Sequence, residues 1–371
     1  MLVRFKLIIT GIVFSLFLIP NTANAQILQD STFLIQLKKD IDCIYNQKYD
    51  KAQELNIKIA KSYSGHPVQY LLRGLITYWK NYPMLYSSSD RITLEDDLRQ
   101  CIRLSEKHVN NAYKAEYLLS NLCARGLLIK LYVDNNQIFK VIPLATSTYK
   151  YLRQSFSLTG DCSDLYYYTG VYNFYRESYP DAYPVYKPLA LLFPPGDMKS
   201  GLKQLNNSAS NAVVLRGESY FLLTMIYLNF ENKFQQALQY SRPLHEMYPD
   251  NIQYSAQYIK NLLLLKQYDE AEKLIIASLK ETENKYYQAQ LTIFKGILQE
   301  KKYHDSSLAQ QYYLSGINRI TPYGEYGKEF AAYACFGLSR ISYAKSDNNA
   351  GKKYREKARK LGNYKNLTFD K

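Results

Sequence analysis

The residues that could do chemistry in this chain are few, and their spacing matches no catalytic or metal-binding motif. Four histidines are present, and none has the spacing to another histidine, cysteine or carboxylate that a metal site needs. The sequence contains no Gly-x-Ser-x-Gly elbow, no Walker A loop and no Gly-x-Gly-x-x-Gly turn. The acidic run 95–97 lies at the start of a predicted helix, where carboxylates offset the helix dipole. We therefore expect a protein that is not an enzyme and that carries neither metal nor cofactor.

The cysteines give a second, equally weak indication of chemistry. They are Cys43, Cys101, Cys123, Cys162 and Cys335, and no two of them have Cys-x-x-Cys spacing. An odd number leaves at least one cysteine unpaired within a monomer. A bond between Cys123 and Cys162 is conceivable in an oxidising compartment, but burial as small hydrophobic residues is the favoured interpretation for most of them.

Tyrosine is the strongest compositional signal, with 38 residues in the chain. One group has a 4-3-4 spacing that places its members on one face of a helix: Tyr168, Tyr172, Tyr175 and Tyr179. The favoured interpretation is that this face packs on neighbouring helices, with the hydroxyl groups at the rim. The alternative is an aromatic platform for a sugar ring or an extended peptide, within the Tyr-rich region 166–186 and with the proline-rich segment 180–195 as its lip.

The N-terminus has the pattern of a cleaved signal peptide. Arg4 and Lys6 precede a mostly apolar run over 7–19, Pro20 breaks it, and the small-x-small sequence 23–25 gives a cleavage site after Ala25. The apolar run is too short to span a bilayer as a helix, which argues against a membrane anchor. We expect export to the periplasm or the exterior of a bacterial cell, with no transmembrane segment in the mature chain.

The net charge is strongly positive. The formal charge is +14, and removing residues 1–25 leaves 45 basic against 33 acidic residues. Within the last predicted helix, six cations face a single acid, Glu356: Lys352, Lys353, Arg355, Lys357, Arg359 and Lys360. A solvated helix face is the favoured interpretation, and a site for an acidic ligand is the alternative. Export argues against nucleic acid as the partner.

Helical periodicity extends over almost the whole mature sequence, and its breaks are short. A Ser-Gly-His-Pro turn over 64–67 and a polar insertion over 82–93 separate the first helices. Five prolines between 180 and 195 exclude one continuous helix there. Asp197 is predicted to be the N-cap of a helix over 198–210.

A short phrase recurs along the chain at a period typical of stacked helical hairpins. Phe234 with Ala237 is repeated 34 residues later as Tyr268 with Ala271, and Tyr49 with Ala52 matches the same pattern. A weaker copy, 35 residues after Tyr268, pairs Tyr303 with Ser306. Hairpins of this kind bury their apolar faces only by stacking on neighbours.

At these positions the chain resembles the tetratricopeptide repeat (TPR) family, in which an aromatic residue precedes a small residue by three at the start of each second helix. Pro249 matches the proline near the end of the family's unit, whereas the corresponding position in the next unit is Glu283. The resemblance covers 213–361 well, 30–110 moderately and 111–212 poorly. It implies an all-α, right-handed superhelical array of antiparallel hairpins.

The expected organisation follows from this coverage. A signal peptide over 1–25 precedes TPR-like hairpins over 26–110, a divergent helical region over 111–212 contains the Tyr- and Pro-rich segment, and a C-terminal array over 213–371 ends in the basic helix. In TPR arrays the first helices line the concave face, which would place Lys260 and Lys295 on neighbouring helices, with Gln253 and Gln288 two turns earlier. They would clamp a carboxylate of a peptide or an acidic glycan; solvated lysines are the alternative.

These observations lead to two expected functions. The first is a non-enzymatic, exported scaffold or adaptor that binds a protein or peptide in the cell envelope. The second is a module that binds a glycan or another ligand through the Tyr-rich region 166–186.

Overall fold

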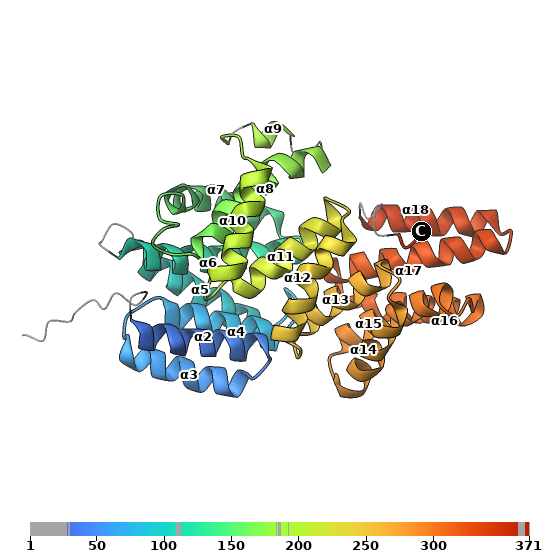
Figure 1. Ribbon diagram of the computed structural model, residues 1–371, viewed down its shortest axis with the longest axis horizontal. Coiled ribbons are helices and arrows are strands. Elements are labelled where there is room, and N and C mark those ends of the chain that lie inside the picture. The colour runs from blue at the N-terminus through green and yellow to red at the C-terminus, as the bar shows by residue number, and fades with distance from the viewer. Residues whose placement is uncertain are drawn as a thin grey trace, which may run out of the picture.

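The computed structural model shows an all-helical protein whose helices pack in sequential hairpins (Figure 1). It describes residues 28, 30–108, 113–182, 184, 187–191, 193–362 and 368–370, so the predicted signal peptide lies outside the described residues. The helices are α2 (Ser31–Tyr45), α3 (Tyr49–Ser62), α4 (Val68–Lys80), α5 (Asp90–Glu106), α6 (Lys114–Asp134), α7 (Ile138–Ser155), α8 (Leu165–Ala182), α9 (Lys187–Ala190), α10 (Met198–Asn211), α11 (Arg216–Asn229), α12 (Phe234–Met247), α13 (Ile252–Leu264), α14 (Tyr268–Glu281), α15 (Lys285–Lys301), α16 (Ser306–Ile320), α17 (Glu325–Ala344) and α18 (Asn348–Leu361), with a 3-10 turn η2 at Thr321–Tyr323.

Apart from the four-residue α9, these are sixteen helices in eight consecutive pairs: α2–α3, α4–α5, α6–α7, α8–α10, α11–α12, α13–α14, α15–α16 and α17–α18. Each second helix also packs on the first helix of the next pair, and first helices touch each other from α2 through α6 and from α11 through α17. This pattern is that of a helical repeat array, because every hairpin buries its apolar faces against its neighbours.

One turn geometry recurs between the two helices of most pairs. Six non-glycine residues lie in the left-handed region with φ of 54–61°, each two residues before a second helix: Gln47, Asn136, Asn232, Lys266, His304 and Ser346. The next backbone N–H closes the turn onto the end of the first helix, as from Lys48 to the Cys43 carbonyl at 2.8 Å and from Gln137 to the Tyr132 carbonyl at 2.7 Å. The turn therefore identifies α6–α7 as the same structural unit, although the sequence phrase was not recognisable there.

The turn also corrects the predicted register of the weaker repeat. Because His304 holds the left-handed position, the residue equivalent to Ala271 is Ala309, which is fully buried, and not Ser306. Tyr303 lies before the turn and is 49% exposed. From Asn232 onward the turns are 34, 38 and 42 residues apart, because the later first helices are longer. The constant period expected from the sequence therefore holds for one step only.

The predicted N-cap at Asp197 is confirmed. Its carboxylate accepts hydrogen bonds from the backbone N–H groups of Lys199 and Ser200 at 2.9 and 3.2 Å. Asp30, Asn251, Asn284, Asp305 and Asp347 cap other helices in the same way. These caps satisfy N–H groups that have no partner inside the helix and so fix where each hairpin begins.

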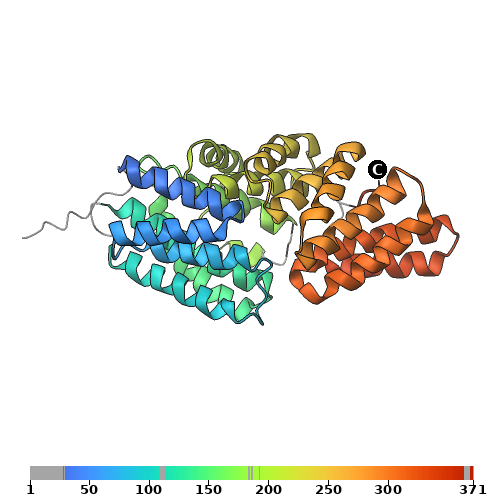
Figure 2. The ribbon, with the colours of Figure 1, turned by 90° about the horizontal axis from the view of Figure 1, so that it is seen from below.

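The array turns back on itself, so that the first hairpins lie beside later ones (Figure 2). The contact is rich in tyrosine: the ring centroid of Tyr45 lies 5.5 Å from Trp79, 5.2 Å from Tyr248 and 5.8 Å from Tyr254. Farther along, Tyr82 packs on Tyr286 and Tyr326. We call these rings, together with the Glu218 carboxylate that accepts hydrogen bonds from two of them, the aromatic seam. Its members are Tyr45, Trp79, Tyr82, Glu218, Tyr248, Tyr254, Tyr286 and Tyr326.

The hydroxyl groups of the seam are satisfied by acceptors from distant parts of the chain. Glu218 accepts from Tyr45 at 3.3 Å and from Tyr254 at 3.1 Å. Tyr248 donates to Asp42, and Tyr326 donates to the Met84 carbonyl. Burial raises the pKa of the Glu218 carboxyl, although the nearby Lys130 ammonium and the two tyrosines oppose that rise. Part of the tyrosine excess is therefore structural, since each ring fills space while its hydroxyl ties two hairpins together.

Candidate functional site

Helix α7 differs from the other helices of the array in how little of it is covered. Ser155 is its only buried residue. The side chains of Ile138, Phe139 and Ile142 are 46%, 94% and 58% exposed. One side of α7 packs on α6, whereas α8 contacts α7 only lightly and packs much more closely on α10. The start of the outward side of α7 is therefore an apolar surface that no other described helix covers.

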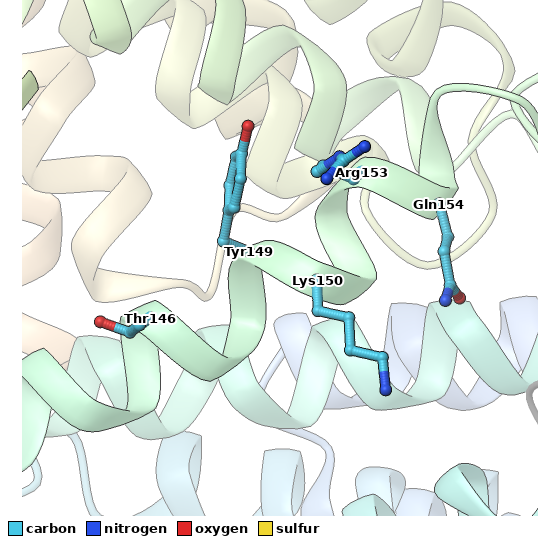
Figure 3. Close-up of a pocket in the computed structure, with 5 residues that line it drawn as sticks. All are labelled: Thr146, Tyr149, Lys150, Arg153 and Gln154. Atoms are coloured by element: carbon cyan, nitrogen blue, oxygen red, sulfur yellow. The ribbon is translucent and has the colours of Figure 1, made fainter. Parts of the chain in front are cut away.

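The second half of the same face borders a shallow cavity of about 490 Å³, lined by Thr146, Tyr149, Lys150, Arg153 and Gln154 (Figure 3). The spacing of these residues spreads them over nearly half of the circumference of α7. In Figure 3, Tyr149 and Arg153 point toward one edge of that half, and Lys150 and Gln154 point toward the other. No carboxylate lines the cavity, so it carries positive charge together with an aromatic ring.

A cluster of aromatic rings packs against one of the lining residues, Tyr149. The ring centroid of Tyr149 lies 4.8 Å from Phe193 and 5.7 Å from Tyr172. Tyr172 donates a hydrogen bond to the Pro194 carbonyl at 2.6 Å. Its pKa is raised, first by burial and then by its hydrogen bond with Tyr149. The rings thus join α7, α8 and the segment that follows α9 into one cluster.

The segment that follows α9, from Phe193 to Gly196, is held to α8 by charged side chains. Arg176 donates to the Phe193 carbonyl at 3.1 Å, and Glu177 accepts from the Gly196 N–H at 2.8 Å. Gly196 comes so close to α8 that a Cβ atom there would lie 2.6 Å from the Asn173 carbonyl oxygen. The end of the proline-rich segment is therefore held against α8.

We call the uncovered side of α7 the α7 stripe: Ile138, Phe139, Ile142, Thr146, Tyr149, Lys150, Arg153 and Gln154. Its positions lie within about half of the helix circumference, so the apolar part and the cavity border the same half of α7. The stripe can bind a ligand that offers apolar surface at one end and negative charge at the other.

The four tyrosines predicted to share a face lie in four different surroundings. Tyr168 points toward the interior near Cys123, and burial raises its pKa. Tyr172 packs on Tyr149, which lines the cavity, and Tyr175 packs 5.3 Å from both Phe174 and Phe230. Tyr179 is the exposed member of the group. The structure therefore connects Tyr172 to a cavity but does not arrange the four rings as one open platform.

The residues predicted to form a carboxylate clamp also separate. Lys260 is 1% exposed, and its ammonium lies 2.8 Å from the Glu329 carboxylate. Lys295 is half-buried, with its ammonium 5.0 Å from the centre of the Tyr312 ring. Gln253 is half-buried in the first turn of α13, and Gln288 donates to the Thr282 carbonyl at 2.8 Å. Lys260 is thus enclosed in the packing between α13 and α17 and is not available to a ligand from solvent.

Sequence reasoning missed the α7 stripe, although its signal is present. The sequence of α7 contains Ile138, Phe139 and Ile142 near its start, three cations, and no aspartate or glutamate. Counting charges helix by helix would have separated α7 from its neighbours. The periodicity alone could not, because it does not reveal which apolar face remains uncovered.

The comparisons with known proteins leave the family open. No protein-family profile matches the chain, and a search of curated proteins finds no match. Of the helices that the structure describes, none combines the length and apolar character needed to cross a bilayer. Within the same described residues, no three His, Cys, Asp or Glu side chains gather as metal ligands would.

Proposed function

We propose that this chain is a non-enzymatic scaffold or adaptor of TPR-like hairpins, exported to the cell envelope, that binds a protein partner on the α7 stripe. The observation that carries the proposal is the exposure of Phe139, at 94%, together with Ile138 and Ile142 on the same helix face. Contiguous exposed apolar side chains cost solubility and are typical of interaction surfaces. The repeated turn geometry supports TPR-like hairpins, for which a right-handed superhelical array is part of the proposal, and the N-terminal sequence pattern supports export.

The proposal is tested by comparing capture of envelope proteins by three forms of the full chain. Phe139→Glu places a charge in the stripe, whereas Ile57→Glu places the same charge at a residue of α3 that is 63% exposed. We expect a partner that is captured by the unchanged chain and by Ile57→Glu but lost with Phe139→Glu. Equal capture by all three forms would contradict the α7 site.

Glycan binding is the second candidate function, and the cavity beside Tyr149 and Tyr172 is the observation that favours it. Aromatic rings next to cationic and amide side chains suit a sugar ring that carries a carboxylate. Calorimetry with acidic oligosaccharides checks it: binding that Tyr172→Ala removes would support this candidate.

A further inference from the structure

The α7 stripe has two chemically different halves, and their order identifies the kind of segment that would cover it. The first half is apolar, through Ile138, Phe139 and Ile142, and the second half presents Lys150 and Arg153 beside the cavity. Ile142 and Lys150 are eight residues apart, which is about 12 Å along a helix. A ligand that fits both halves needs apolar side chains and negative charges separated by about two helical turns.

The charges of the second half are not neutralised by the protein itself. The carboxylate of Glu106 lies against α7 through the Tyr151 hydroxyl at 2.9 Å, but Arg125 already pairs with it at 2.7 Å. Neither Lys150 nor Arg153 takes part in an ion pair among the residues that the structure describes. Both side chains are exposed, so an incoming carboxylate would form its pair without breaking an existing one.

We infer that the occupant of the α7 stripe is an acidic amphipathic segment of another protein, with its apolar side chains on Phe139 and Ile142 and its carboxylates between Lys150 and Arg153. This inference rests on the proposed function, because it names the partner of the same site. Helix-in-groove recognition of this kind uses apolar anchors spaced by three or four residues, with charge pairs at the rim that fix orientation.

Two other occupants fit the stripe less well. A second copy of this chain would meet α7 about a two-fold axis, so that an antiparallel pairing places each apolar half against the other's cations. A sugar acid would use the cavity but would leave Phe139 and Ile142 uncovered. In addition, the Tyr149 ring is already in contact with Phe193 and Tyr172, which reduces the face available for stacking.

Selection from a random peptide library tests the inference on the full chain without assuming a natural partner. Selections are run in parallel on the unchanged chain, Phe139→Glu, Ile57→Glu and the double variant Lys150→Glu with Arg153→Glu. We expect the unchanged chain and Ile57→Glu to enrich peptides in which Leu, Ile or Phe is followed by Asp or Glu. The double variant should keep the apolar preference but exchange the acids for Lys or Arg, with at least a tenfold loss of affinity for the original acidic peptides.

The outcomes separate this inference from the proposed function. Peptides that Phe139→Glu binds as well as the unchanged chain would overturn both, as would a failure to enrich any peptide. Peptides lost with Phe139→Glu but showing no acidic preference, or no charge exchange in the double variant, would overturn the acidic segment alone. Binding of an oligogalacturonate that Arg153→Gln abolishes, without any peptide enrichment, would assign the stripe to a glycan instead. Circular dichroism of each variant confirms that the helices are retained.

Discussion

The aromatic seam and the α7 stripe are both rich in rings and charges, yet they differ in whether those groups are already satisfied. In the seam, Tyr45 and Tyr254 are buried and donate to Glu218. In the stripe, Phe139 is exposed, and no carboxylate lines the cavity with Arg153. Groups that have found partners inside the chain hold the fold together. Groups that have not are the ones left for another molecule, so tyrosine content alone is a poor guide to the site.

The comparison predicts that a seam tyrosine contributes far more to stability than an exposed one. Tyr254→Ala removes a fully buried ring and leaves Glu218 with one donor fewer, so we expect the free energy of unfolding to fall by about 3–5 kcal/mol. Tyr303→Ala, at a half-exposed ring, is the matched control and should cost about 1 kcal/mol or less. Denaturant titration measures both, and equal losses would show that the seam does not hold the hairpins together.

Lys260 extends the comparison to a cation that is already paired. Lys260→Met leaves the Glu329 carboxylate without its cation, with the Tyr333 hydroxyl still donating to it, and we expect destabilisation of about 3 kcal/mol. Adding Glu329→Gln should recover part of that loss, because the unpaired charge is then removed. Lys295→Met, which loses only a contact with the Tyr312 ring, should cost about 1 kcal/mol or less. Loss of partner capture by Lys260→Met at unchanged stability would restore this lysine to a binding role.

The buried carboxyl of Asp40, in α2, predicts how the stability of the fold changes with pH. Burial raises the pKa of this fully buried carboxyl to about 8, above its usual value of 3.8, and neither oxygen accepts a hydrogen bond from the described residues. The folded chain therefore keeps a proton that the unfolded chain loses, so this group lowers stability as the pH rises from about 4 to about 8. Asp40→Asn should remove this slope, which amounts to at most about 1.4 kcal/mol per pH unit. Chemical denaturation at pH 5, 6 and 7 measures it, and an unchanged slope would contradict the assignment.

The smallest expected effect is on the stability of α7 variants. Phe139→Glu exchanges one exposed side chain for another, so the free energy of unfolding should change by less than about 0.5 kcal/mol. A loss of several kcal/mol would mean that Phe139 packs within the chain, and the contrast with the seam would then fail.

Much of the fold could be predicted from the sequence, because hairpin boundaries are local. The aromatic and small residues at Tyr49 and Ala52, or at Tyr268 and Ala271, mark second helices correctly, and the Asp197 cap follows from the preference of free N–H groups for a carboxylate. The weaker repeat was misplaced by three residues, because the exposed Tyr303 resembles the repeated aromatic while the turn is set by His304.

The site could not be predicted in the same way, because it depends on long-range packing. The helical spacing of Lys260 does not reveal that α17 supplies Glu329 as its partner, and the spacing within α7 does not reveal that α8 packs mainly on α10. The spacing within α8 selects Tyr172, but it does not reveal that Tyr149 of another helix packs on this ring. Burial depends on how the whole chain packs. A pattern within one helix therefore shows which residues share a face, but it does not show which other helix packs on that face.

Site-specific photo-crosslinking tests the central claim most directly, namely that the partner lies on the α7 stripe. A photoreactive phenylalanine is placed at position 139 of the full chain, or at position 57 as the control, and the chain is irradiated in the cell envelope. We expect a specific crosslinked protein from position 139, suppressed when Lys150 and Arg153 are also changed to glutamate, and none from position 57. The same crosslinked protein from position 57, or none from position 139, would contradict the claim.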